Sequence, residues 1–122
     1  EKRIVGGLLG QWAVWTRVAV ELLEEVKRVR GQEGVPAELL TRAARWTDAN
    51  AAVFDAANRF HGVIAGVHEV LRRQGLLEGV WCLDPEEGLS PGQAEEIERV
   101  YREHPDLTDD GFVKAHLREG LG

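Results

Sequence analysis

Residues 36–57 read PAELLTRAARWTDANAAVFDAA, and this stretch predicts the longest helix of the chain. Pro36 suits the first position of a helix, because it has no N–H to leave unpaired and its φ is already near the helical value. Apolar and small side chains then recur at steps of three and four residues, which indicates one face of a helix about 22 residues long. That face consists of Leu39, Leu40, Ala43, Trp46, Asn50, Val53, Phe54 and Ala57.

The residues before this stretch predict another helix, over residues 11–30. Its last turn contains Lys27 and Arg28, where the helix dipole favours cations. Three glycines weaken a helix at its start, so residues 4–10 are either its first turns or a short buried strand. The apolar stripe keeps the spacing of three and four residues and consists of Ile4, Leu8, Trp12, Trp15, Ala19, Leu22, Val26 and Val29.

A third helix is expected over residues 63–74, after a kink or loop at residues 58–62. Gly75 suits the left-handed cap that ends many helices, with Leu76 packing back on the last turn. Residues 76–89 show no helical rhythm and predict an extended connection. The inward face expected for the third helix consists of Val63, Ile64, Val67, Val70 and Leu71.

The motif SPGQ at residues 90–93 predicts the start of a fourth helix. Ser90 suits the N-cap, Pro91 suits the first turn, and Gln93 can reach back to the cap. Pro105 forbids the continuation of this helix, so we expect it to end about two residues earlier. A last helix is expected to begin near Thr108, with an apolar stripe of Phe112, Val113 and Leu117.

These elements predict a mainly α fold with four or five helices and at most one short strand. The chain has 122 residues, enough for one domain, and we expect it to form a single helical unit. It begins at Glu1 and contains no methionine, so we expect a fragment or a processed product.

The charge and cysteine content limit the partners and the compartment. The 21 acidic and 15 basic residues give a net charge of −6, which argues against nucleic acid and against an anionic membrane surface. The sequence has no apolar run of the roughly 20 residues that a membrane span needs. Its single cysteine, Cys82, excludes an internal disulfide framework, so we expect a reducing cytoplasm.

Serine and cysteine give no sign of a catalytic nucleophile. Ser90 is the only serine, and its neighbours explain it as a helix cap. Cys82 lies between Trp81 and Leu83, where a small buried thiol is expected rather than a reactive thiolate. The acidic residues are interpreted as a solvated loop at Asp84, Glu86 and Glu87, and as the first turn of a helix at Asp109 and Asp110.

The histidines leave a small metal-dependent enzyme as a third hypothesis. His61 and His68 are seven residues apart, so they would share a face if a single helix contained both. Gly62 argues against such a helix, and no third ligand follows at helical spacing, so we expect no metal site. Surface or packing roles explain the four histidines better, namely His61, His68, His104 and His116.

None of the three lysines suits imine chemistry. An imine-forming lysine needs an apolar, buried setting in which it loses its proton near neutral pH. Lys2 lies between two charged residues at the start of the chain, and Lys27 lies among acidic and arginine side chains. Lys114 belongs to the exposed face of the expected last helix. We therefore predict no catalytic residue and no cofactor site in this chain.

Residues 67–100 read VHEVLRRQGLLEGVWCLDPEEGLSPGQAEEIERV. This stretch resembles the C-terminal helical region of the dihydrodipicolinate synthase and N-acetylneuraminate lyase family. In that family a helix ends in a Gly-Leu pair, here Gly75-Leu76, and an extended connection with a proline follows, here Pro85. A Leu-Ser pair, here Leu89-Ser90, then starts the final helix. The resemblance is specific over these residues and extends from Pro36 to Tyr101.

The resemblance implies the end of a (β/α)8 barrel enzyme that performs pyruvate-dependent aldolase or lyase chemistry through a lysine Schiff base. Residues 1–35 would then hold the last barrel strand and helix, and residues 36–122 the added helical region. The family's catalytic lysine and tyrosine come from earlier strands, so neither carries over to this chain. Tyr101 lies on a late helix instead. A barrel needs about 200–250 residues, so this chain cannot close one alone.

The expected function is therefore the non-catalytic C-terminal portion of such an enzyme, which completes the scaffold and the subunit contacts. The partner would be the remainder of the barrel or another copy of the chain, and we expect a homo-oligomer. The alternative is a stand-alone helical module for protein interaction or oligomerisation, in which the stripe with Trp12 and Trp15 meets another chain.

Overall fold

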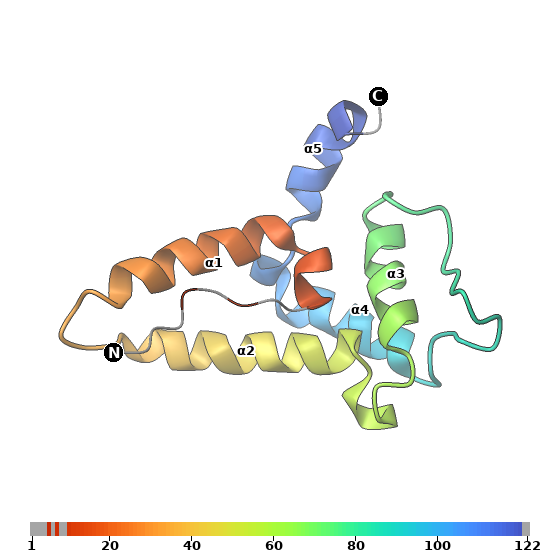
Figure 1. The fold of residues 1–122 in the computed structure, drawn as a ribbon, viewed down its shortest axis with the longest axis horizontal. Helices are drawn as coiled ribbons and strands as arrows, with labels where there is room; N and C mark the ends of the chain where they lie inside the picture. The colour runs from red at the N-terminus through yellow and green to blue at the C-terminus, as the bar shows by residue number, and fades with distance from the viewer. Residues whose placement is uncertain (1–4, 6, 8–9, 121–122) are drawn as a thin grey trace.

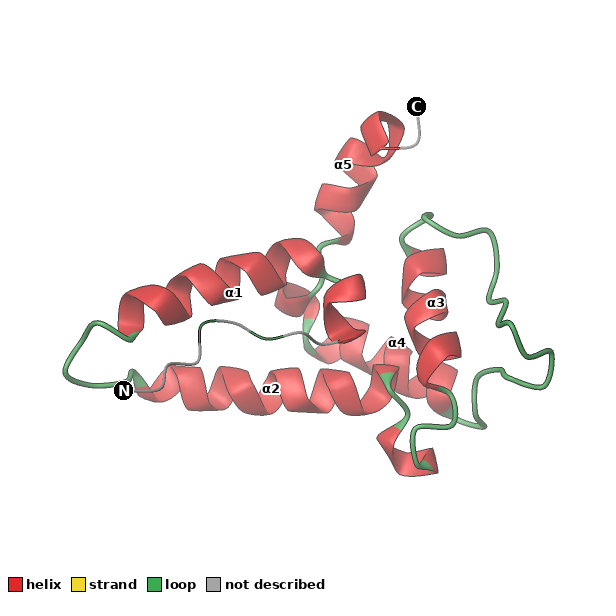
Figure 2. Cartoon of the chain, in the orientation of Figure 1, coloured by secondary structure: helices red, strands yellow, loops and turns green. Residues whose placement is uncertain are grey.

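The computed structural model of the chain describes Val5, Gly7 and residues 10–120. These residues form five α-helices and three short 3-10 helices, with no strand among them, which confirms the mainly α class (Figure 2). The α-helices are α1 (Thr16–Val29), α2 (Ala37–Val53), α3 (Val63–Arg73), α4 (Gln93–Glu103) and α5 (Asp110–Gly120). The 3-10 helices are η1 (Gly10–Ala13), η2 (Ala56–Asn58) and η3 (Pro105–Leu107).

Helix α2 is the centre of the packing. It contacts both α3 and α4, which also contact each other. Helix α1 runs beside α2 in the opposite direction, joined to it by a short turn, and α5 projects away from the other helices (Figure 1). None of the described helices is long and apolar enough to cross a membrane.

One hydrophobic core joins the first four α-helices and the turn after α4. Its largest fully buried side chain is Trp15, and Ile97 of α4 has no exposure to solvent. The remaining members include residues that the helical periodicity predicted, above all Trp46 and Val53 of α2. The core consists of Val14, Trp15, Val18, Trp46, Ala49, Ala52, Val53, Val70, Ile97, Val100 and Leu107.

The predicted helix over residues 11–30 is shorter in the structure and begins at Thr16. Trp15 has a left-handed backbone, with φ at 51°, which separates η1 from α1. Its indole is nearly fully buried, and burial of so large a side chain outweighs the helical preference of the local sequence. The expected stripe is divided, because Trp15 enters the core whereas Trp12 stays partly exposed.

A distant residue caps the start of α1. Trp15 makes no side-chain cap, and the backbone N–H of Arg17 donates instead to Asp109, at 2.9 Å. Asp109 also accepts from the Gln74 amide at 2.7 Å, so its buried carboxylate holds α1 against the end of α3. The sequence predicted Asp109 as part of an acidic first turn, but α5 begins one residue later, at Asp110, which alone occupies that first turn.

The predicted helix over residues 36–57 ends at Val53 rather than near Ala57. Asp55 has a left-handed backbone, with φ at 58°, and the chain turns there into η2. The predicted break at residues 58–62 is confirmed. Several side chains expected on apolar stripes are exposed instead, among them Leu40 at 72%, Ile64 at 44%, Val26 at 44% and Phe112 at 42%.

The predicted left-handed cap at the end of α3 is confirmed, whereas the Leu76 side chain, which was expected to pack back on the last turn, is 37% exposed. Gly75 has a left-handed backbone, with φ at 79°. Its N–H donates to the Arg72 carbonyl at 3.0 Å, and the Leu76 N–H donates to the Leu71 carbonyl at 2.9 Å. This pair of bonds is a Schellman motif. Residues 76–89 form the predicted connection without regular secondary structure.

The start of α4 differs from the prediction in one respect. Gln93 does reach back, since its Oε1 accepts from the Ser90 N–H at 3.0 Å. Ser90 does not cap the helix, however, and Pro91 precedes it, because α4 begins at Gln93 after Gly92. The Ser90 hydroxyl donates to Asp55 instead, at 2.5 Å. The predicted end before Pro105 is confirmed.

The strand or helix expected over residues 4–10 lies outside the described residues, except for Val5, Gly7 and Gly10. Lys2 lies outside them as well.

Candidate functional site

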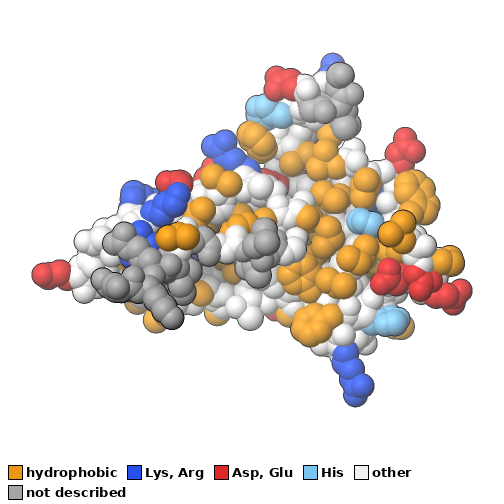
Figure 3. All heavy atoms as spheres, in the orientation of Figure 1, with side chains coloured by type: hydrophobic (Ala, Val, Ile, Leu, Met, Phe, Trp, Pro, Cys, Tyr) orange, Lys and Arg blue, Asp and Glu red, His pale blue; other side chains and the backbone are white. Residues whose placement is uncertain are grey.

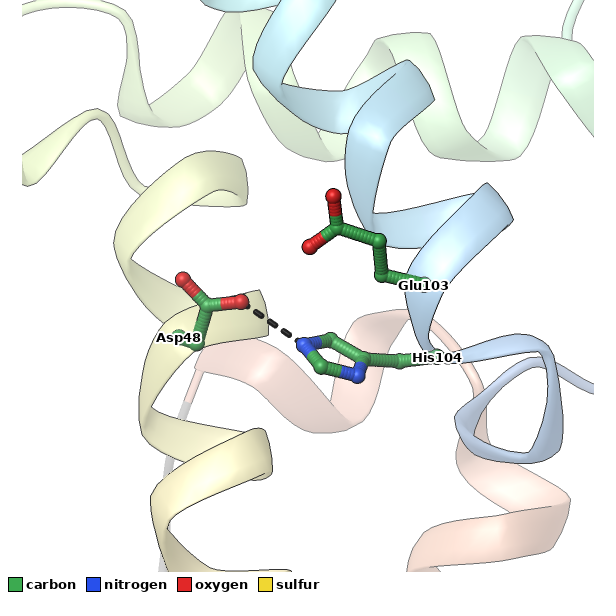
Figure 4. A group of neighbouring side chains, drawn as sticks. All are labelled: Asp48, Glu103 and His104. Atoms are coloured by element: carbon green, nitrogen blue, oxygen red, sulfur yellow. Dashed lines mark hydrogen bonds and ion pairs between the residues drawn. The ribbon is translucent and has the colours of Figure 1, made fainter.

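Charged side chains of α2 and of the C-terminal end of α4 lie next to one another (Figure 4). The Arg99 guanidinium donates to both oxygens of Asp48 at 2.8 Å and to Glu103 at 3.0 Å. His104 follows α4 directly, and its Nε2 lies 2.7 Å from Asp48. Because its Nδ1 accepts from Arg45 at 3.3 Å, Nε2 carries the proton and donates to Asp48.

The hydrogen bonds between opposite charges in this cluster shift the pKa values of its members. Hydrogen bonds from Arg99 and then from His104 lower the pKa of Asp48 to about 2. The hydrogen bond from Arg99 also lowers the pKa of Glu103, and the carboxylates of Asp48, Glu96 and Glu103 raise the pKa of the Arg99 guanidinium. The acids are therefore ionised near neutral pH and Arg99 is their counter-ion.

Carboxylate oxygens and a histidine nitrogen, as found in this cluster, are also the atoms that bind metal ions in proteins. Ligand atoms of Asp48, Glu103 and His104 all lie within 4.8 Å of one another, and among residues 10–120 no other group of three such side chains meets in this way. Arg99, however, already binds both carboxylates of the group. A divalent cation would have to displace this guanidinium, so the arrangement fits an ion-pair network between α2 and α4 better than a metal centre.

Replacing Asp48 by asparagine is expected to lower stability at neutral pH by about 1 kcal/mol, a value reduced for the partial exposure of the carboxylate. The folded pKa of Asp48 lies below its ordinary value, so its contribution is complete above about pH 4 and disappears as the pH falls toward 2. The difference between Asp48→Asn and the unchanged chain in urea unfolding should therefore shrink over that range. The exposed Glu33→Gln variant is the control, and an equal difference at pH 2.5 and pH 7 would contradict the assignment.

A second polar cluster is buried at the turn between α2 and α3. The Asp55 carboxylate accepts from the Ser90 hydroxyl at 2.5 Å, from the Asn58 amide at 2.7 Å and from the Gly62 N–H at 2.9 Å. Burial raises the pKa of Asp55, and these hydrogen bonds outweigh it, so the net pKa is lowered. These hydrogen bonds connect Asp55 with other parts of the chain, so we assign the Asp55 carboxylate a structural role.

Gln93 completes this cluster from the first turn of α4. Its side-chain amide donates to the carbonyls of Gly62 at 3.0 Å and Val53 at 3.2 Å. A Cβ on Gly62 would lie 2.1 Å from the Gln93 Oε1, and a Cβ on Gly66 would lie 2.0 Å from the Val53 carbonyl. The two glycines therefore leave the notch into which Gln93 fits.

The histidines of the third hypothesis do not form a site in the described residues. His61 is exposed and precedes α3, whereas His68 lies within α3 and is half-buried. Neither belongs to a group of three potential ligands among these residues. His116 is exposed and stacks on Phe112, with ring centroids 4.3 Å apart.

Cys82 is partly exposed, rather than buried as the sequence analysis expected. Burial, followed by the nearby charges of Glu87 and Asp84, raises the pKa of the Cys82 thiol, which disfavours a reactive thiolate. Lys27 pairs with Glu24 on the surface of α1, at 2.6 Å, and Lys114 is exposed on α5. Neither described lysine therefore occupies an apolar pocket.

Tyr101 has a structural environment rather than a proton-relay environment. Its ring packs edge-on against Trp15, with centroids 5.8 Å apart, and Arg73 lies 5.4 Å from its centroid. Burial raises the pKa of its hydroxyl, which lies 3.5 Å from an oxygen of Asp110. The hydroxyl therefore stays protonated at physiological pH.

Hydrophobic side chains cover much of one face of the molecule, over α3 and the connection that follows it (Figure 3). On the connection, Trp81 is 67% exposed and Leu83 is fully exposed. We call this region the apolar face and define it by the exposed side chains of Ile64, Leu76, Trp81 and Leu83. Exposed apolar side chains that gather on one face of a soluble protein mark contact surfaces.

Sequence reasoning missed both polar clusters, because their members come from separate helices. Asp48 and Arg99 are 51 positions apart, and Asp55 and Ser90 are 35 apart. One local signal was available: Arg99 and Glu103 are four residues apart on a predicted helix, which indicates a side-chain pair. Nothing in the sequence indicated that Asp48 would join them.

Comparison of the chain with models of known families, with curated proteins and with solved structures finds no match. The resemblance to the dihydrodipicolinate synthase and N-acetylneuraminate lyase family therefore stays a prediction from the sequence.

Proposed function

We propose that this chain is the non-catalytic C-terminal helical region of a pyruvate-dependent aldolase or lyase of the dihydrodipicolinate synthase type. In that role it completes the scaffold and contributes to subunit contacts, within a cytoplasmic homo-oligomer. The partner is the remainder of the barrel or another copy of the chain, and the net charge of −6 argues against nucleic acid.

The observation that carries the proposal is the apolar face. Trp81 and Leu83 are large apolar side chains that stay in contact with solvent in this chain, and exposed apolar patches mark interaction sites. They lie on the connection between α3 and α4, inside the stretch that carries the family resemblance. Covering them would remove apolar surface from water, which favours association with another part of the protein.

The local structure of the resembling stretch supports the same proposal. The Gly75-Leu76 pair ends α3 in a Schellman motif, and a connection without regular structure follows. The chain then enters α4 shortly after the Leu89-Ser90 pair. The resemblance implies a helix that starts at the Leu89-Ser90 pair itself, whereas α4 begins three residues after Ser90.

A scaffold role also agrees with the positions of the described polar groups. Lys27 and Lys114 are exposed, and the clusters around Asp48 and Asp55 are used in contacts between helices. Imine chemistry needs a lysine surrounded by apolar side chains. We therefore assign the imine-forming lysine of the proposed enzyme to residues outside 10–120.

The alternative function is a stand-alone helical module for protein interaction or oligomerisation. The same apolar face favours this alternative, since an apolar surface can contact a second protein as well as the remainder of a barrel. The two proposals differ in what the gene encodes before Glu1.

The coding sequence upstream of Glu1 tests the proposal. We expect an open frame of about 180 further residues in which strands and helices alternate, with a lysine inside an apolar strand. A stop codon in frame a few codons before Glu1, with no such region, would contradict the aldolase parentage and leave the interaction module.

A further inference from the structure

A positive charge without a partner lies where the apolar face begins. Arg59 follows η2 directly, is exposed, and precedes the first turn of α3, which contributes Ile64 to the face. Within the residues that the structure describes, the Arg59 side chain forms no hydrogen bond and no ion pair. Phe60, the next residue, is 59% exposed. The turn before α3 therefore presents an unpaired cation and an aromatic ring to solvent.

The backbone of this turn is strained, and nothing within the described chain covers the side chains that it presents. Arg59 and Phe60 both have left-handed backbones, with φ at 58° and 65°, which bulky residues rarely adopt. Asp55 fixes the turn, because its carbonyl accepts from the Phe60 N–H and its carboxylate accepts from the Gly62 N–H, both at 2.9 Å. Strain that the surrounding structure maintains is typical of functional sites. Here it holds two side chains ready for a contact.

Negative charges without partners lie on the connection, beside another part of the same face. Asp84 and Glu86 are exposed and Glu87 is half-buried, and they follow Leu83 closely in the chain. None of the three carboxylates forms an ion pair with a described residue. We call Asp84, Glu86 and Glu87 the acidic run. Figure 3 shows acidic side chains gathered over the connection, next to the hydrophobic area.

We propose that the apolar face binds the same face of a second copy of the chain, oriented so that Arg59 of each copy pairs with the acidic run of the other. A two-fold contact joins one patch to itself, so each charge on the patch must find its opposite elsewhere on that patch. This face carries both signs, and within one copy they do not pair. The exposed Trp81 and Leu83 then pack between two ion pairs at the rim.

The complementary charges select the second copy over the remainder of a barrel. A contact with a different surface needs a match to that surface and gives no reason for both signs to border one apolar face. Opposite charges at the rim of an interface fix its orientation more than its affinity, and like charges placed there oppose the contact. This inference rests on the subunit contacts of the proposed function and names their partner and orientation.

The test is an exchange of charges between two variants, followed by light scattering after size exclusion. The unchanged chain should have the mass of two copies. Arg59→Glu sets a negative charge against the acidic run, and Glu86→Lys/Glu87→Lys sets positive charges against Arg59, so each variant alone should dimerise at least tenfold more weakly. An equimolar mixture of the two should recover the dimer, because one native and one exchanged ion pair can form.

Matched controls make the same changes of charge outside the face. Arg118→Glu and Glu33→Lys/Glu95→Lys alter exposed residues without an ion pair to any described residue, and they should dimerise like the unchanged chain. Far-ultraviolet circular dichroism verifies that each variant keeps its helices. If Arg59→Glu fails to fold, Glu86→Lys/Glu87→Lys decides the question against its own control.

Three results would overturn the proposal. Both exchanged variants could dimerise like the unchanged chain, or their mixture could stay monomeric, and either result would reject the pairing of Arg59 with the acidic run. An unchanged chain that is monomeric or forms larger assemblies would reject the two-fold contact and leave the remainder of the barrel or another protein on this face. None of these results bears on the coding sequence before Glu1, which tests the aldolase parentage separately.

Discussion

Gly66→Ala is expected to destabilise the chain by about 3 kcal/mol or to prevent folding, because the new methyl group has no space. The Cβ would lie 2.0 Å from the Val53 carbonyl oxygen and 2.6 Å from the Gln93 Nε2. The nearer contact is with backbone, so a side-chain rotation cannot relieve it. Helix α3 would have to move away from the end of α2, and the buried bonds of Gln93 would lengthen or break.

Gly111→Ala is the matched control, since Gly111 also lies within a helix and its Cβ would meet no atom within 4 Å. Alanine is the better helix former, so this variant should be unchanged or more stable by up to about 1 kcal/mol. Urea unfolding followed by circular dichroism measures both. Equal stabilities for the two variants would show that α3 and α2 do not approach each other as described.

Asp55→Ala is the second substitution with a large expected effect, about 3 kcal/mol of lost stability. The carboxylate is the shared acceptor for Ser90, Asn58 and the Gly62 N–H, and its removal leaves buried donors unpaired. Alanine also tolerates the left-handed backbone at this position less well than aspartate does. The turn that links α2 to α3 should therefore loosen together with the start of α4.

A double-mutant cycle separates the contribution of the Ser90–Asp55 hydrogen bond from the other losses of stability in Asp55→Ala. If Ser90 donates to Asp55, Ser90→Ala should cost clearly less in the Asp55→Ala background than in the unchanged chain. The exposed Asp84→Ala variant is the control and should change stability by no more than about 0.5 kcal/mol. Fully additive effects of Asp55→Ala and Ser90→Ala would contradict the bond.

Local signals in the sequence predicted the helices well. The rhythm of apolar residues located α2, α3 and α4, and Gly75 and Pro105 located two helix ends. These signals act through neighbours in the chain: a glycine permits a left-handed cap, and a proline removes an N–H and clashes with the preceding turn. They need no knowledge of the tertiary fold.

The errors occurred where tertiary contacts overrode local preference. Trp15 and Asp55 adopt left-handed backbones that neither residue type prefers, the first to bury an indole and the second to accept three hydrogen bonds. Ser90 was predicted as a cap from its neighbours, yet its hydroxyl bonds to Asp55, 35 positions away. Periodicity alone also cannot tell which apolar residue at the edge of a stripe is covered, as the exposed Leu40 shows.

The central claim is that the apolar face is a contact surface, and in the isolated chain, which lacks any further part of the protein, we expect this face to bind a second copy of the chain. Light scattering after size exclusion, over a dilution series of the isolated chain, tests it most directly. The account predicts a mass above that of the monomer that falls on dilution, and a monomeric Leu83→Asp variant. Val35→Asp, at an exposed position outside this face, should still associate. A wild-type chain that stays monomeric at every concentration would contradict the claim.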